Sequence, residues 1–370
     1  MAVTAGRRLR VVVAPDSFKG SADASVVAAA LAGGWRRARP GDEVVEVPMA
    51  DGGEGTLDAV LAAENATERT ESVRLPDGRA HLARWALVGD RAVVELAECC
   101  GLPLVGSSDP LGADTEALGT VLCAVLDAGV AELTLAVGGS ASTDGGSGAL
   151  RALGLRIVDR VGADVVPGGA GLLEAARVDR RGLRAPPVRG VTVLCDVTAP
   201  LLGPRGAARV FGPQKGASPA VVADLERGLA RWHALLDGDA DLAGAGAAGG
   251  TAYGLATAWG AVLRPGAAAV ACLVGLDQAV SGADVVITGE GRWDVQSASG
   301  KATGHVLGMA EDVGARGVVV AGELAAGLPP GARGWSLVDE AGGAGAARRD
   351  APRWLEVVGA RAALELAGPV

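Results

Sequence analysis

Six segments of this 370-residue chain place glycines and polar residues directly after short apolar runs. In the first, residues 14–21, an apolar run ends and Asp16, Ser17 and Lys19 precede a predicted helix. The free N–H groups at a helix start attract anions, and an ammonium group adds to that attraction. A capping role for Asp16 is the simpler alternative. Capping does not need Lys19, so we predict that this segment binds a substrate or a phosphate.

Two further segments carry paired acids. Asp51 and Glu54 lie among three glycines in residues 48–56, and Glu290 and Asp294 follow an apolar run in residues 288–301, which end on Lys301. Hard cations prefer oxygen ligands, so each pair is a candidate magnesium site. Turns capped by acids are the alternative.

The richest segment, residues 138–148, has five glycines and four hydroxyl side chains after a predicted strand. Backbone N–H groups in such a loop can cradle a phosphate. The pattern matches neither a Walker A loop nor GxGxxG, and a flexible loop is the alternative. The predicted binding residues here are Gly138, Gly139, Ser140, Asp144, Gly145 and Gly146.

The remaining two segments are less specific. Asp196 follows another predicted strand, with Lys215 in residues 211–216, and a turn role is equally compatible with Asp196. The glycines of residues 246–250 fit close helix packing as well as ligand contact. We predict Asp196 to be catalytic and Lys215 to bind substrate.

The lysine count sharpens this interpretation. The chain has 34 basic residues, of which only Lys19, Lys215 and Lys301 are lysines, and all three fall in or beside these segments. Lysine is a compact point charge whereas arginine is a planar fork, so a chain that otherwise uses arginine suggests a geometric requirement at these positions. Acids for a metal, glycines for phosphate and lysines for charge together indicate phosphoryl transfer.

Composition excludes several other classes. The net charge is −9 and Tyr and Phe total three, which argues against nucleic-acid binding. Five cysteines without CxxC spacing argue against a zinc site or a disulfide scaffold and favour buried small hydrophobes. The uncharged stretch 242–263 is mostly Ala and Gly, so we expect a glycine-rich loop and a buried helix rather than a membrane span. No signal peptide is expected, and the prediction is a soluble cytoplasmic protein.

The elements that would position these residues form an α/β pattern. Strands at 9–14 and 43–47 alternate with helices at 22–37 and 56–64, which predicts parallel strands. Asp77-Gly78 and Gly89-Asp90 indicate antiparallel hairpins. Alternation returns with a strand at 284–288, a helix at 301–312, a strand at 317–321 and a terminal helix at 353–366. We therefore predict a discontinuous parallel α/β domain (1–66 and 280–370), an inserted mixed α/β domain (67–279), and an active site in the cleft between them.

Taken together, the motifs resemble the bacterial glycerate kinase family of the type that acts in glycolate and glucarate breakdown. The matching segments are APDSFKGS (14–21), PMADGGEGT (48–56), GGSASTDGG (138–146), CDVT (195–198), FGPQKGA (211–217), GAAGG (246–250) and GEGRWDVQSASGK (289–301). The resemblance implies phosphorylation of D-glycerate by ATP with magnesium, usually at the 2-hydroxyl, and a split flavodoxin-like domain. Thr143, Ala199 and Trp293 depart from the usual Asn, Asn and Leu.

In the resulting hypothesis, a glycerate hydroxyl attacks the γ-phosphate of ATP in line. Asp51 with Glu54, or Glu290 with Asp294, would hold magnesium, and Asp196 would take the hydroxyl proton. Lys19 or Lys301 would offset charge on the transferring group. The alternatives are the 3-hydroxyl as acceptor, another small hydroxy acid, a nicotinamide dehydrogenase, for which no fingerprint is present, and a non-catalytic acid-binding protein. The sequence predicts no oligomeric state.

Overall fold

The structure is a computed structural model that describes residues 7–63, 65–106, 109–295, 297 and 301–366. The chain divides into two compact units. Unit 1 comprises Met1–Asp51, Asp58–Glu64 and Gly266–Val370, and unit 2 comprises Gly52–Leu57 and Asn65–Pro265. Residues 266–279, assigned by the sequence to the inserted domain, group with unit 1, whereas residues 52–57 group with unit 2.

Unit 1 is built on a five-stranded parallel sheet in the order β13-β12-β11-β1-β2. Counted along the chain within this unit, the order is 5-4-3-1-2, which is the flavodoxin-like arrangement and confirms the predicted fold class. The strands are β1 (Arg10–Val13), β2 (Glu43–Glu46), β11 (Val285–Trp293), β12 (Arg316–Leu324) and β13 (Arg333–Ser336).

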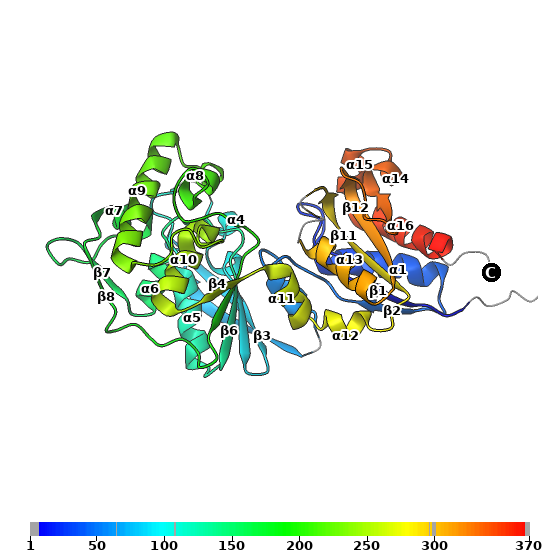
Figure 1. The fold of residues 1–370 in the computed structure, drawn as a ribbon, viewed down its shortest axis with the longest axis horizontal. Helices are drawn as coiled ribbons and strands as arrows, with labels where there is room; N and C mark the ends of the chain where they lie inside the picture. Colours follow the sequence, from blue (N-terminus) through cyan, green and yellow to red (C-terminus); the bar gives the residue numbers. More distant parts are fainter. Residues whose placement is uncertain (1–6, 64, 107–108, 296, 298–300, 367–370) are drawn as a thin grey trace, which may run out of the picture. The chain divides into compact units, whose positions relative to one another are not determined.

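Helices cover both faces of this sheet (Figure 1). Val318 and Val320 of β12 pack into one core with α1 and α16, whereas Val319 and Ala321 pack with Leu307 of α13. This period of two is the pattern of a strand buried on both faces. The helices of the unit are α1 (Ala24–Ala38), α11 (Gly266–Leu273), α12 (Leu276–Val280), α13 (Ala302–Asp312), α14 (Leu337–Ala341), α15 (Ala344–Arg349) and α16 (Ala351–Leu366).

The N-terminal and C-terminal segments of unit 1 are held together by α1 and α16, whose backbones are in direct contact. A Cβ added at Gly34 would lie 2.0 Å from the Glu356 carbonyl oxygen, and one at Gly359 would lie 2.2 Å from that of Leu31. Only glycine permits this approach, so the discontinuous unit closes as one core.

Strand β11 is longer than the prediction of residues 284–288. It remains paired with β12 as far as Trp293 opposite Leu324. A Cβ on Gly289 would lie 1.8 Å from the Val320 carbonyl oxygen, so the glycines that suggested a loop instead serve strand packing at this point. Glu290 is therefore a strand residue, and Lys301 immediately precedes α13. Of the predicted loop after Asp294, residues 296 and 298–300 lie outside the described residues.

Unit 2 contains a mixed six-stranded sheet in the order β10-β9-β6-β5-β4-β3. The predicted hairpins make β3–β5 antiparallel, while β5, β6, β9 and β10 are parallel. The strands are β3 (Ala66–Arg74), β4 (Ala80–Val88), β5 (Arg91–Glu95), β6 (Glu132–Ala136), β9 (Val191–Leu194) and β10 (Val262–Arg264), with a separate hairpin of β7 (Arg156–Val158) and β8 (Arg177–Asp179).

The helices of unit 2 cover this sheet and bury its polar loops. They are α3 (Ala97–Cys100), α4 (Leu102–Val105), α5 (Glu116–Asp127), α6 (Ser147–Ala152), α7 (Gly168–Glu174), α8 (Ala207–Phe211), α9 (Pro219–Leu236) and α10 (Ala247–Trp259), and α2 (Thr56–Leu61) crosses the division between the units. The stretch 242–263 forms the expected loop and helix. No helix within the described residues is both long and apolar enough to cross a membrane.

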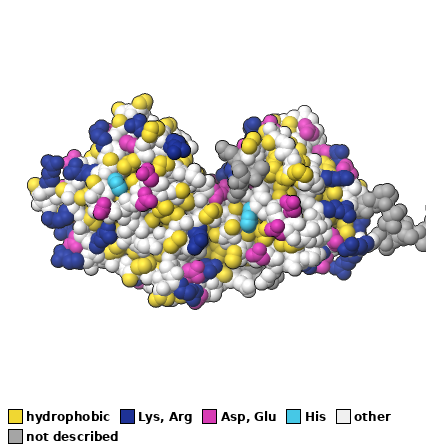
Figure 2. All heavy atoms as spheres, in the orientation of Figure 1, with side chains coloured by type: hydrophobic (Ala, Val, Ile, Leu, Met, Phe, Trp, Pro, Cys, Tyr) yellow, Lys and Arg dark blue, Asp and Glu magenta, His cyan; other side chains and the backbone are white. Residues whose placement is uncertain are grey.

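Side chains of both charge signs are interspersed over the visible face of each unit (Figure 2). Surface arginines form ion pairs with carboxylates, for example Arg189 with Asp90. The cysteines divide: Cys99 and Cys100 are buried as predicted, but Cys272 is exposed, contrary to that prediction.

Candidate active site

Three segments of unit 1 bring acids to the carboxyl edge of its sheet. The N–H of Asp16 donates to the Gly289 carbonyl oxygen at 2.8 Å, and that of Met49 donates to Pro15 at 2.8 Å. These bonds extend the pairing of β1 with β11 and β2 past the strand ends. Asp16, Asp51 and Glu290 therefore meet where the strand order reverses, the position at which open α/β sheets bind ligands.

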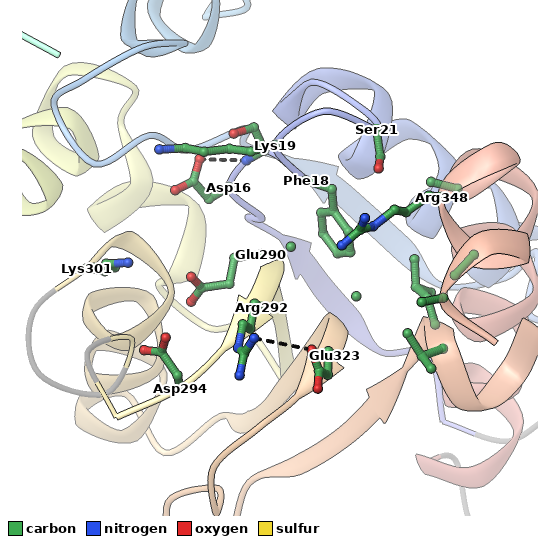
Figure 3. A pocket seen from close by; sticks show the side chains of 18 of the residues that line it. Asp16, Phe18, Lys19, Ser21, Glu290, Arg292, Asp294, Lys301, Glu323 and Arg348 are labelled. Carbon is green, nitrogen blue, oxygen red and sulfur yellow. Dashed lines mark hydrogen bonds and ion pairs between the residues drawn. The ribbon is translucent and has the colours of Figure 1, made fainter. Parts of the chain in front are cut away.

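A pocket of about 360 Å³ opens at this edge, entirely within unit 1. Seven of the predicted residues line it: Asp16, Ser17, Lys19, Asp51, Glu290, Asp294 and Lys301. Figure 3 shows the Glu290 carboxylate in the space bordered by Asp16, Lys301 and Asp294. The volume falls within the usual range for small-molecule sites.

Asp16 is the most perturbed acid of the pocket. Burial raises the pKa of its carboxyl to about 7, and the nearby Asp51 carboxylate adds to that effect. The Ser17 N–H, 2.6 Å from Oδ1, and the Lys19 ammonium oppose it. A carboxyl group that titrates near neutrality is suited to accept a proton.

Glu290 presents an unsatisfied oxygen. Burial raises the pKa of its carboxyl, although the Ser297 and Thr303 hydroxyls and the Lys301 ammonium lower it. Its Oε1 is buried without a hydrogen-bond partner among the described residues. Such an atom fits a group that arrives with a ligand, since a buried acceptor left unpaired costs about 1–3 kcal/mol.

The acids do not form a preformed metal cage. Within the described part of the chain, no three His, Cys, Asp or Glu residues group closely enough to hold a metal ion. Magnesium does not require such a cage, because it is usually bound by one or two carboxylates together with substrate phosphates. Glu290 and Asp294, which share the pocket, fit that pattern. The alternative pair, Asp51 with Glu54, is divided between the two units.

The far part of the pocket has a different chemistry, which the sequence did not indicate. Val338 and Ala344 supply apolar surface there, backed by the buried side chains of Phe18, Leu337 and Ala347. The exposed Arg348 of α15 also lines the pocket, and its guanidinium has no hydrogen bond or ion pair with any described residue. Figure 3 shows Phe18 and Arg348 on the side of the pocket away from Asp294 and Lys301. No glycine-rich motif marks α14 or α15, so sequence reasoning had no signal for them.

In unit 2, the glycine-rich loop at residues 138–148 is mostly interior. Ser140, Ser142, Thr143, Asp144 and Ser147 are all at most 6% exposed. Asp144 accepts hydrogen bonds from Thr115 N and Oγ1, at 3.0 and 2.8 Å, and from the N–H groups of Gly146 and Gly148. The Gly145 N–H donates to the Gly249 carbonyl oxygen.

In the predicted phosphate cradle, the backbone N–H groups of the loop would be free to bind a phosphate. The Gly145 and Gly146 N–H groups are already used inside the unit, and Asp144 fastens the loop to the start of α5. The Trp232 indole of α9 closes over the loop by donating to the Gly145 carbonyl oxygen at 3.0 Å. Binding by this loop stays a prediction, with Gly138 and Gly139 as its accessible residues.

Lys215 lies beneath the same loop and is only 3% exposed. Its Nζ donates to Ser140 Oγ at 2.9 Å and to the Ser142 carbonyl oxygen. Burial lowers the pKa of this ammonium to about 8, although the nearby Asp144 carboxylate raises it. Lys215 is thus placed to shape the loop, whereas Lys19 and Lys301 line the pocket of unit 1.

Two of the predicted site residues of unit 2 follow its parallel strands: Gly138 comes after β6 and Asp196 after β9. A Cβ on Gly138, which follows β6, would lie 2.6 Å from Gly53 Cα, so the two loops touch backbone to backbone. Glu54 on the second loop and Asp196 after β9 are both exposed. Glu95, which sequence reasoning missed, ends β5 and accepts from the Gly55 and Leu57 N–H groups at 3.1 and 2.9 Å.

The three departures from the expected motifs are not in the pocket lining. Thr143 is buried with its hydroxyl unpaired among the described residues. The carbonyl oxygen of Ala199 accepts a hydrogen bond from the Gly246 N–H at 2.9 Å. Trp293 fills a small core beside α13 and donates to Gly327. Trp293 therefore replaces the usual leucine with another buried apolar side chain.

Comparison with known proteins gives a consistent result. The sequence profile of the glycerate kinase family matches residues 11–364. Glycerate 2-kinase of Escherichia coli is 38% identical over 85% of this chain and 86% of its own, and glycerate kinase of Bacillus subtilis is 38% identical over 85% of both chains. A solved structure from Salmonella typhimurium LT2, assigned as glycerate kinase 2, superposes with a TM-score of 0.84 at 36% identity and covers 97% of this chain and 98% of that one.

Proposed function

Because the chain belongs to the glycerate kinase family, we propose that it transfers the γ-phosphoryl group of ATP to a hydroxyl group of D-glycerate. The observation that carries this proposal is the pocket of unit 1, where acids and ammonium groups meet at the switch point of a parallel sheet. Phosphoryl transfer depends mainly on positioning and electrostatic stabilisation, which such a set of fixed charges supplies.

The charge of the pocket supports a magnesium requirement. The polar end holds four carboxyl groups (Asp16, Asp51, Glu290 and Asp294) and two ammonium groups (Lys19 and Lys301), while Arg292 pairs with Glu323. Acids thus outnumber free cations where the phosphates would lie, which favours a polyphosphate that arrives with a divalent cation. Glu290 and Asp294 are the residues that would hold the ion. When bound, magnesium neutralises phosphate charge and fixes the orientation of the phosphates.

We assign the role of proton acceptor to Asp16 in place of Asp196. Asp16 is held by the Ser17 N–H at the polar end of the pocket, and its carboxyl titrates near neutrality. Asp196, which the sequence predicted to be catalytic, is exposed in unit 2 and does not line this pocket. A general base of this kind contributes about 10²–10⁴-fold to the rate.

Lys19 and Lys301 would offset charge on the transferring group. Each ammonium lowers the pKa of a neighbouring acid, Asp16 and Glu290 respectively, so each lies close enough to interact with charge at the polar end. In unit 2, Gly138 and Gly139 keep their predicted role in phosphate binding, and Glu54 stays the predicted partner of Asp51 in the alternative magnesium pair.

We propose the 2-hydroxyl as the acceptor, which the name of the Escherichia coli relative, glycerate 2-kinase, supports. The test incubates the protein with D-glycerate, ATP and magnesium and identifies the product by phosphorus and proton NMR. We expect ADP and 2-phosphoglycerate in equal amounts. Formation of 3-phosphoglycerate would refute the regiochemistry alone.

Controls separate the remaining parts of the proposal. Omission of D-glycerate reports background ATP hydrolysis, and EDTA tests the metal requirement. A panel of other small hydroxy acids tests substrate choice. Absence of ADP formation with every acid would refute the kinase activity.

A further inference from the structure

The pocket of unit 1 is chemically divided, and only one part is used by the reaction proposed above. The polar part holds the acids and the two lysines. The other part presents Val338 and Ala344 at its surface, and the buried side chains of Phe18, Leu337, Ala347 and Ala351 lie behind them. Arg348 also lines this part, unpaired with any described residue.

The chemistry of this second part does not match glycerate. Every carbon of glycerate carries oxygen, so the molecule has no apolar surface to place against Val338 and Ala344. Desolvating its polar groups against apolar walls would cost free energy. A planar aromatic group gains by the same burial, and an arginine guanidinium stacks on such a face.

We propose that this part of the pocket, formed by Phe18 and by α14, α15 and the start of α16, binds the purine nucleoside of the phosphoryl donor, with Arg348 covering the base. The proposal rests on the proposed function, because it takes the donor to be a purine nucleoside triphosphate. The phosphates then extend toward Lys19, Lys301 and the acids, along the length of one pocket.

The elements of this site explain how the wall is held in place. Ser336 caps α14 by accepting from the Asp339 N–H at 3.3 Å, and its hydroxyl donates to Gly322 of β12. Leu337 and Ala347 are both buried in the core of the unit. The apolar wall is therefore fixed by the sheet, while the Arg348 side chain projects from an exposed helix position.

The test measures ADP binding by calorimetry, without glycerate, for the full chain and three variants. Arg348→Ala removes the guanidinium, and Ala344→Leu fills exposed space in the pocket. Arg349→Ala is the matched control, because Arg349 is the exposed neighbour that does not line the pocket. Thermal melts establish that each variant is folded.

We expect Arg348→Ala to weaken ADP binding by about 5–30-fold, the equivalent of about 1–2 kcal/mol for a cation over an aromatic ring. Ala344→Leu should weaken it by a similar factor, and Arg349→Ala by less than about twofold. In steady-state kinetics, Arg348→Ala should raise the KM for ATP and leave the KM for D-glycerate unchanged.

The outcomes distinguish this inference from the proposed function. Normal ADP affinity in both Arg348→Ala and Ala344→Leu, with intact kinase activity, would overturn the inference alone. A raised KM for D-glycerate in Arg348→Ala would also overturn it, because Arg348 would then hold the carboxylate. Arg348-dependent ADP binding by a chain that transfers no phosphate to any hydroxy acid would support the inference and refute the proposed function. No binding of ADP or ATP by the unaltered chain would overturn both.

Discussion

The two units carry the same kind of sequence signal and use it differently. In unit 1, the polar residues that follow β1 and lie on β11 line an accessible pocket. In unit 2, the polar residues that follow β6 are buried and bonded to one another, with Asp144 at 0% and Lys215 at 3% exposed. Glycines beside polar residues after a parallel strand therefore indicate a loop with an unusual backbone conformation. The helices packed around that loop determine whether it is accessible to a ligand.

The difference has a structural cause. The loop of unit 2 is covered by α9, through Trp232, and by α10, whose Gly249 allows contact with Ser142. At Gly249 and Gly250 the backbone φ angles are +65° and +87°, a conformation that glycine adopts most readily. No helix covers the corresponding edge of β1 and β11 within the described part of unit 1 in this way, and the charges there remain accessible.

The largest effect is expected on turnover, when the proposed proton acceptor in unit 1 is replaced. Asp16→Asn keeps the size of the side chain but cannot accept the substrate proton, so kcat should fall by about 10²–10⁴-fold. In the unaltered protein, log kcat/KM should rise with pH and level off above about pH 7, because burial raises the pKa of Asp16 to about 7 and the ionised form is the base. Steady-state kinetics from pH 5 to 9 measure both.

Asp196→Asn is the comparison, since Asp196 is the acceptor suggested by the sequence. It should retain the rise in kcat/KM toward pH 7. Loss of that rise in Asp196→Asn, with its persistence in Asp16→Asn, would reverse the assignment.

The next effect tests the interior role of the unit 2 loop. Asp144→Ala leaves four donors from Thr115, Gly146 and Gly148 without an acceptor, so the free energy of unfolding should fall by at least about 3 kcal/mol. Urea denaturation measures this change. Asp196→Ala, an exposed acid in the same unit, should change it by less than about 1 kcal/mol. Equal stabilities for the two variants would contradict a structural role for Asp144.

A comparable effect should appear as a pH dependence. Folding lowers the pKa of Lys215 from 10.5 to about 8, so between those values the unfolded chain binds more protons and the free energy of unfolding rises with pH. The total rise is about 3 kcal/mol. Lys215→Met removes this group, so the difference in unfolding free energy between the two proteins should vary with pH over that range. A difference that is constant from pH 7.5 to 10.5 would show that folding does not lower the pKa of Lys215.

The smallest expected effect concerns Lys19. Lys19→Arg keeps the charge but replaces a compact ammonium by a planar fork, and kcat should fall by about tenfold without loss of stability. Arg292→Lys is the reverse exchange in the same pocket, at an arginine whose ion pair with Glu323 is 3.6 Å long and exposed. It should cost less than about threefold. Near-normal turnover in Lys19→Arg would remove the argument drawn from the rarity of lysine.

Much of the fold could be predicted because its causes are local. Apolar runs alternating with helical segments indicated the parallel strands of unit 1, and Asp77-Gly78 and Gly89-Asp90 indicated the hairpins of unit 2. The prediction ended β11 too early, because Gly289 and Gly291 are also typical of loops. The close packing of Gly289 is against Val320 of β12, which lies some 30 residues further along the chain.

The sequence by itself determined the family and the set of chemical groups, because the motifs are contiguous and their residue types follow from phosphoryl transfer. The sequence could not show which of those groups line a ligand pocket and which are buried in the fold. Only the tertiary structure placed Asp16, Glu290 and Lys301 in one pocket and buried Lys215 with Asp144, since burial depends on helices remote in sequence. The same holds for Arg348, which no motif marks and which becomes part of the site only because α15 packs beside Phe18 at the pocket.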